Sequence, residues 1–352
     1  MNAHLLPLTL LALALSVPAS HAANTPPPAA TAPDAGKALA TAAGAILQGD
    51  SALALRALRE LPADAFTGDD ASIRTCMIER FDREAPPALV TDIEDPFARA
   101  LLATYQDYWW HALREPAKRT GLETRLQTSL RELLGDAGRG ARDLDALEDI
   151  VQTQLEQRGF HAQLGAVTPL RDLMMWRTQT TREFEVPLID APYQVKAELL
   201  DDFASIGWSH FGTCGKTANG GWATEDRLYA ILPRYKDGIA GEGFQVVFLG
   251  HETQHLADKN RFAPMQDWEL EYRAKLAELA RADGALSRKR LLGMLTAQGD
   301  SSQAAHPYAN THVVRDLTRK LGQSPDTVPV ERLQTAAREL LLEDSRRRKP
   351  KS

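Results

Sequence analysis

The chain has 352 residues, of which 43% are hydrophobic and 25% charged, and its formal net charge is −6. This composition is ordinary for a globular protein with a sizeable core, and the length allows two domains. The acidic balance argues against nucleic-acid binding, so we expect no nucleic-acid partner.

The N-terminus has the pattern of a secretory signal. An apolar run from Leu5 to Val17 is followed by Ser20-His21-Ala22, which places small residues where signal peptidase reads them. The run is too short for a comfortable transmembrane helix, and no later segment is long and apolar enough to span a bilayer. We therefore expect residues 1–22 to be a cleaved signal peptide and the mature protein to be periplasmic or secreted, without a membrane span.

The next part of the chain is predicted to be helical. Residues 23–36 are rich in Pro and Ala and are expected to form a disordered linker. Residues 37–140 follow as a helical region, in which Asp95-Pro96 is a typical helix start. An aromatic and apolar stripe at helical spacing comes after that start and is typical of a buried core: Phe97, Leu101, Tyr105, Tyr108 and Trp109.

Residues 141–345 have a mixed pattern. A helix is predicted near residues 143–157. Strands are then predicted at 160–167, 172–186, 193–199 and 227–235, with a Gly-rich loop at 212–221. Pro233 indicates that the last of these strands is an edge strand or carries a bulge. Further helices are predicted at 242–256, 266–281, 308–321 and 329–345, and the basic run 346–352 is expected to be a disordered tail.

The fold class predicted from these elements is α+β and mostly helical, with a small antiparallel or mixed sheet in the C-terminal region. The boundary near residue 140 is soft, and the alternative is that the helices pack onto the sheet as one domain. Cys76 and Cys214 are the two cysteines. In an oxidising compartment they can form a disulfide or remain separate buried thiols, and the sequence leaves both open.

The predicted helix 242–256 carries the motif His251-Glu252-Thr253-Gln254-His255. Residues four apart share a helix face, so both imidazoles can bind one metal ion, with Glu252 beside the position of a bound water. The apolar run before the motif indicates a buried helix. Two buried histidines without a ligand would be costly, although a hydrogen-bonded pair in the core is the alternative.

This motif resembles that of the gluzincin, or thermolysin-like, zinc metallopeptidases. In that family a glutamate on the following helix is the third ligand, within Glu-x-x-Ala or Glu-x-x-x-Asp, and Glu271-Tyr272-Arg273-Ala274 fits the first version. Position 275, where the second version has Asp, is Lys275. The resemblance covers about residues 225–282. It implies a zincin-like domain with a zinc ion (Zn2+) held by His251, His255 and Glu271, and Glu252 as the general base.

Several further side chains are candidates for this site. Glu269 competes with Glu271, because the two flank the apolar stripe of their helix on opposite sides. Asp258 is either an acceptor that orients a ligand histidine or a solvated or helix-terminal charge. Tyr308 and His312 lie four apart, and the resemblance makes them candidates for stabilising an oxyanion. The strand 227–235 is either a plain sheet strand or one that pairs with an extended substrate.

The function expected from these features is an exported zinc metallopeptidase that acts on a peptide or protein substrate. One alternative is an envelope binding or assembly factor whose zinc site is structural or vestigial. Another is a zinc hydrolase of a non-peptide amide or ester. The sequence specifies neither the substrate nor the oligomeric state.

Overall fold

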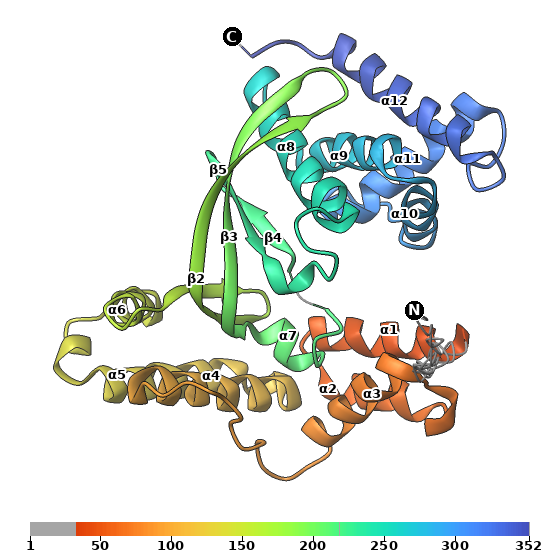
Figure 1. Cartoon of the computed structure of the whole chain (residues 1–352). Coiled ribbons are helices and arrows are strands. Elements are labelled where there is room, and N and C mark those ends of the chain that lie inside the picture. The colour runs from red at the N-terminus through yellow and green to blue at the C-terminus, as the bar shows by residue number, and fades with distance from the viewer. Residues whose placement is uncertain (1–32, 218, 352) are drawn as a thin grey trace, which may run out of the picture.

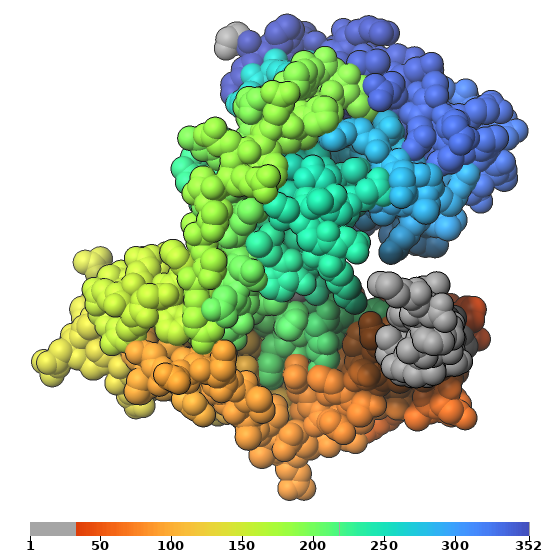
Figure 2. All heavy atoms as spheres, viewed as in Figure 1, coloured from red at the N-terminus to blue at the C-terminus, as the bar shows by residue number. Residues whose placement is uncertain are grey.

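The computed structural model describes residues 33–217 and 219–351, so the predicted signal peptide and most of the predicted linker lie outside the described residues. The fold is α+β and mostly helical, as predicted. One five-stranded sheet lies between two groups of helices, which Figure 1 shows at opposite ends of the molecule. Figure 2 shows the same arrangement in spheres, with the green strands between the orange and the blue helices.

The first group of helices begins inside the predicted linker. Pro33 is the first residue of α1, where a missing N–H costs nothing, and Ala35 and Leu39 of that helix are fully buried. Asp95 caps α4 by accepting a hydrogen bond from the Ala98 N–H at 2.8 Å, as its sequence predicted. The six helices are α1 (Pro33–Leu47), α2 (Ser51–Arg59), α3 (Gly68–Phe81), α4 (Pro96–Arg114), α5 (Arg119–Leu134) and α6 (Leu144–Glu156).

The sheet is mixed and has the order β1-β2-β3-β5-β4. Its strands are β1 (His161–Val167), β2 (Leu170–Pro187), β3 (Pro192–Ile206), β4 (Gly221–Ala223) and β5 (Arg227–Ile231). Only β3 and β5 pair in parallel among the described strands, from Lys196 opposite Arg227 to Leu200 opposite Ile231. The strands β2 and β3 form a long hairpin that connects the two groups of helices (Figure 1).

The expectation that the strand at 227–235 lies at an edge is wrong. β5 lies between β3 and β4, and β4 is the edge strand. The edge position was expected because Pro233 was placed within the strand, whereas β5 ends at Ile231. The proline lies in the following 3₁₀ turn, Leu232–Arg234, where no sheet partner needs its N–H.

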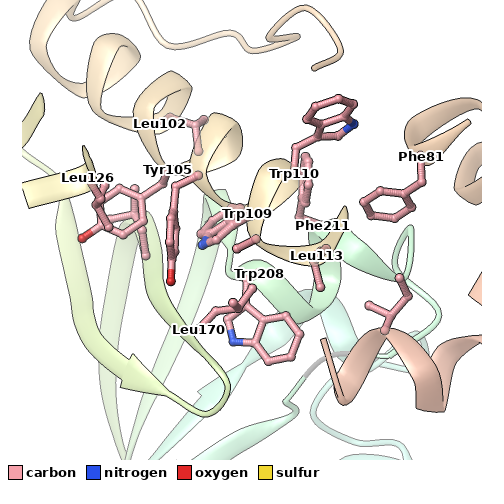
Figure 3. Packing of buried hydrophobic residues seen from close by; sticks show 14 of the residues in the cluster. Phe81, Leu102, Tyr105, Trp109, Trp110, Leu113, Leu126, Leu170, Trp208 and Phe211 are labelled. Carbon is pink, nitrogen blue, oxygen red and sulfur yellow. The ribbon is translucent and has the colours of Figure 1, made fainter. Parts of the chain in front are cut away.

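The larger hydrophobic core joins the first helices to the sheet and crosses the predicted boundary near residue 140. Trp109 of α4 packs against Phe211 of α7 (Trp208–Gly212), and Figure 3 shows these rings together with Trp110, Trp208 and Leu170. The indole N–H of Trp109 donates to the Arg171 carbonyl at 2.8 Å, so the aromatic stripe also anchors β2. A disulfide between Cys76 and Cys214 links α3 to the loop after α7.

The second group of helices has its own core, built from residues such as Leu276, Leu291, Val313 and Leu333. It contains α9 (Asp267–Arg281), α10 (Gly284–Thr296), α11 (Ala305–Leu321) and α12 (Val330–Arg347). The helix α10 was not predicted, because its two glycines and weak apolar periodicity conceal it. No helix in the described part of the chain is long and apolar enough to cross a membrane.

The basic C-terminal run is ordered rather than disordered over residues 346–351. Two backbone hydrogen bonds attach it beside the end of α8 (His251–Arg261): the Ala263 N–H donates to the Lys349 carbonyl, and the Lys351 N–H donates to the Arg261 carbonyl. Arg348 also pairs with Glu269 at 3.2 Å. The carboxylates that receive this tail were not apparent from the basic run alone.

Candidate metal centre

The motif begins where one type of helix gives way to another. Residues Gly243–Gly250 form a π-helix, a rare conformation that is frequent at functional sites, and α8 begins at His251. Phe244 and Phe248 pack this π-helix against the sheet. The rings of His251 and His255 lie 4.6 Å apart between centroids, and both residues are buried.

Glu271 of α9 meets the two histidines, as the resemblance implies. Its Oε1 lies 3.2 Å from Nε2 of His255, and its Oε2 lies 3.6 Å from Nε2 of His251. Donor atoms of the three residues all lie within 4.8 Å of one another. Ligands at tetrahedral zinc, with bonds of about 2.0–2.2 Å, are separated by about 3.4 Å. The observed separations therefore suit a small ion with mixed nitrogen and oxygen ligands.

Glu269 does not take part in this cluster, because it has another structural role. Its Oε2 accepts a hydrogen bond from the backbone N–H of Gln266 at 2.8 Å, which forms one half of a capping box at the start of α9. Its Oε1 pairs with Arg348. Of the two candidate glutamates, the structure therefore places Glu271 beside the two histidines and Glu269 at the helix cap.

A second carboxylate orients His251. Oε1 of Glu278 lies 2.5 Å from Nδ1 of His251, and the Glu278 side chain is fully buried. Metal-binding histidines are commonly held in this way, since a carboxylate fixes the ring and makes it more basic. Burial alone would lower the pKa of His251, but hydrogen bonds to Glu271 and Glu278 outweigh burial and raise it to about 9. Arg290 completes the chain by pairing with Glu278.

Asp258 does not orient either histidine. It is fully buried and pairs with Arg273 through two hydrogen bonds of 2.8 and 2.9 Å, and it accepts another from Gln254 at 2.9 Å. Asp258 is therefore neither a ligand-orienting acceptor nor a solvated charge, although it does lie near the C-terminal end of α8. The pair fixes α8 against α9, which sets the distance between the histidines and Glu271.

Two further side chains place a nitrogen atom close to Glu271. Nδ1 of His306 lies 2.7 Å from its Oε2, and Nζ of the buried Lys275 lies 3.5 Å from the same oxygen. Burial alone would raise the pKa of Glu271, but hydrogen bonds from His251, His255 and His306 lower it well below its usual range. The carboxylate is therefore an anion that attracts positive charge. His306 is exposed and lies at the start of α11.

Tyr308 and His312 lie beside Trp268 of α9. The centroid of the Trp268 ring is 5.2 Å from that of Tyr308 and 4.6 Å from that of His312. No hydrogen bond or ion pair among the described residues connects these two side chains to the cluster. The stretch 306–312 thus reaches the cluster through His306, and the oxyanion role of Tyr308 and His312 stays a prediction.

Glu252 is free to act on a ligand. It is half-buried and forms no hydrogen bond or ion pair with any described residue. Its charge acts on Tyr235, whose pKa is raised by burial and, to a smaller extent, by the Glu252 carboxylate. The Tyr235 hydroxyl donates to the Gly220 carbonyl at 2.8 Å, next to the edge strand β4. Glu252 and Tyr235 are therefore close enough to interact electrostatically.

Comparison with models of protein families, with curated proteins and with solved structures finds no match to this chain. The assignment of the centre therefore depends on its geometry. Glu278 and His306 were not among the residues predicted from the sequence to lie at this cluster. Glu278 follows Glu271 by seven residues, which places both on one helix face, so the spacing could have indicated it. His306 comes from a different helix, and no local signal connects it to Glu271.

Proposed function

We propose that this protein is an exported zinc-dependent metallopeptidase of the gluzincin type. The observation that carries the proposal is the convergence of His251, His255 and Glu271, beside a Glu252 carboxylate that is not engaged elsewhere. Two imidazoles and a carboxylate are the ligand set of catalytic zinc sites that keep one position open. The buried carboxylate behind His251 supports the same assignment.

In this proposal each side chain has a separate task. Zinc, when bound, acts as a Lewis acid that polarises a carbonyl and makes water a stronger acid. Glu252 takes the proton from the attacking water and gives it to the leaving amine. Glu278 holds the His251 ring in place. The Asp258–Arg273 pair keeps α8 and α9 at the separation that the three ligands need.

The test uses the full protein, stripped with a chelator, reloaded with zinc and incubated with a fluorogenic peptide library. We expect cleavage that needs zinc, and a loss of about 10²- to 10⁴-fold in Glu252→Gln with its zinc content unchanged. Glu269→Gln is the matched control and should cleave like the wild type. Equal cleavage by Glu252→Gln and the wild type would show that Glu252 is not the base.

One observation favours the alternative of a binding or assembly factor with a vestigial site. Nζ of Lys275 and Nδ1 of His306 already lie 3.5 Å and 2.7 Å from Oε2 of Glu271, where a metal ion would bind. In this alternative the wild type binds zinc weakly and cleaves no peptide, while Lys275→Met binds zinc more tightly. Tight zinc binding by the wild type, unchanged in Lys275→Met, would exclude it.

A further inference from the structure

The face of α8 that carries Glu252 continues into a groove. Leu256 and Asn260 follow Glu252 at intervals of four residues, so the three side chains lie along one side of the helix. Leu256 and Asn260 line a cavity of about 530 Å³. Eight residues of helix correspond to about 12 Å, so Asn260, at the wall of the cavity, lies about that far along α8 from Glu252.

The opposite wall of this groove is the sheet, at a place where β3 has an open edge. The parallel pairing of β3 with β5 begins at Lys196, so residues 193–195 extend past the start of β5. Tyr193 and Val195 line the cavity there, and the Tyr193 hydroxyl accepts a hydrogen bond from the Asn260 amide at 2.5 Å. We call this cavity the Leu256 groove. Leu256, Val195 and the Tyr193 ring supply the apolar part of its lining, on which an aliphatic chain could pack.

Acidic side chains outnumber basic ones around the Leu256 groove. Glu225 and Asp226, in the turn between β4 and β5, and Glu183 of β2 line it, with Lys196 as the single basic residue. Two of these carboxylates have a partner: Arg227 binds Asp226 at 3.0 Å, and Lys196 lies 3.6 Å from Glu183. Glu225 is exposed and has no ion pair or hydrogen bond among the described residues. The groove therefore combines apolar side chains with one carboxylate that has no partner there.

We propose that the Leu256 groove binds a Lys or Arg side chain of the substrate peptide. The aliphatic part of such a side chain packs on Leu256 and Val195 while its charged head reaches Glu225. An extended peptide covers about 3.3 Å per residue, so a groove that extends to Asn260 reaches side chains up to about three to four residues from the cleaved bond. This inference rests on the proposed peptidase function, because it assumes that Glu252 marks the site of cleavage.

The test measures binding separately from cleavage. Zinc-loaded Glu252→Gln protein is titrated with pairs of fluorescein-labelled, Ala-based decapeptides. The two peptides of a pair carry Arg or Glu at the same position, and the pairs place that residue at each position in turn. We expect the Arg peptides to bind at least threefold to tenfold more tightly at low salt, the size expected for one exposed charge pair. The preference should fall at high salt, because salt screens exposed charges.

The variant that tests the groove is Glu225→Lys, and its matched control is Glu79→Lys. Glu79 is an exposed carboxylate on α3, at the other end of the molecule, so both variants change the net charge equally. We expect Glu225→Lys to abolish the preference for Arg and Glu79→Lys to retain it. Equal binding of Arg and Glu peptides, a preference that survives Glu225→Lys, or no binding of either peptide would overturn the inference.

The cleavage assay separates this inference from the proposed function. Zinc-dependent cleavage by the wild type without any preference for Arg or Lys would overturn the groove assignment and leave the peptidase proposal intact. A preference for Arg peptides in binding, without cleavage by the wild type, would support the groove as a site for basic peptides and contradict the peptidase proposal.

Discussion

Replacing Glu278 by Gln tests whether the cluster is built to hold a metal ion. The substituted amide would keep the shape of the side chain but remove the negative charge that lies 2.5 Å from Nδ1 of His251. A carboxylate that holds a metal-binding histidine is worth about tenfold to hundredfold in metal affinity, or about 1.4–2.7 kcal/mol. Full burial of Glu278 keeps water from taking its place, so we expect a loss within that range.

The assay is a competition titration with a chromophoric zinc chelator between pH 7 and 10. The raised pKa of His251, about 9, means that zinc must displace a proton from this ring at neutral pH. The affinity of the wild type should therefore increase as the pH rises towards 9 and level off above it. In Glu278→Gln the pKa of His251 is lower, so the affinity should level off at a lower pH.

Glu269→Gln is the control for this experiment, because Glu269 lies on the same helix and touches none of the three ligands. It should bind zinc as the wild type does, with the same dependence on pH. The reasoning would be refuted if Glu278→Gln kept the affinity and pH profile of the wild type, or if both variants lost affinity equally while remaining folded by circular dichroism.

Two further predictions concern stability. Replacing Cys76 and Cys214 by Ser should lower the free energy of unfolding by up to about 5 kcal/mol in a denaturant titration, because the disulfide joins residues 138 apart in sequence; an unchanged midpoint would contradict this. Burial raises the pKa of Asp172 to about 6 from 3.8, so the folded state binds the proton more tightly than the unfolded state does. The free energy of unfolding should therefore fall by about 3 kcal/mol as the pH rises from about 4 to 6. Asp172→Asn should remove this dependence, which denaturant titrations at pH 4 and pH 7 would measure. An equal change in the free energy of unfolding between these two pH values, in the wild type and the variant, would contradict the prediction.

Local patterns were sufficient for much of the fold. The cap at Asp95-Pro96, the alternating runs that became β1 and β2, and the His251–His255 spacing each depend on neighbours in sequence, and the structure has them close to where they were predicted. The third strand was predicted at 193–199, but β3 continues to Ile206. The capping box at the start of α9 is harder to predict from sequence. Its N3 residue, Glu269, is the usual one, but its N-cap residue, Gln266, is not among the residues that the sequence pattern requires.

Other features depend on contacts that no local pattern contains. The sequence around Asp258 does not show that this residue is buried, because its partner, Arg273, comes from α9. The position of β5 inside the sheet depends on its parallel pairing with β3, which lies far away in sequence. His306 meets Glu271 only because α11 packs on α9. Tertiary packing, rather than helix or strand preference, determines each of these three features.

X-ray absorption at the zinc edge of the zinc-loaded protein shows directly whether His251, His255 and Glu271 bind the ion. We expect four nitrogen and oxygen ligands at about 2.0–2.2 Å, with scattering from two imidazole rings. Glu271→Ala should lose both the bound zinc and this spectrum. A spectrum of six oxygen ligands without imidazole, or an unchanged spectrum in Glu271→Ala, would show that His251, His255 and Glu271 do not form the zinc site.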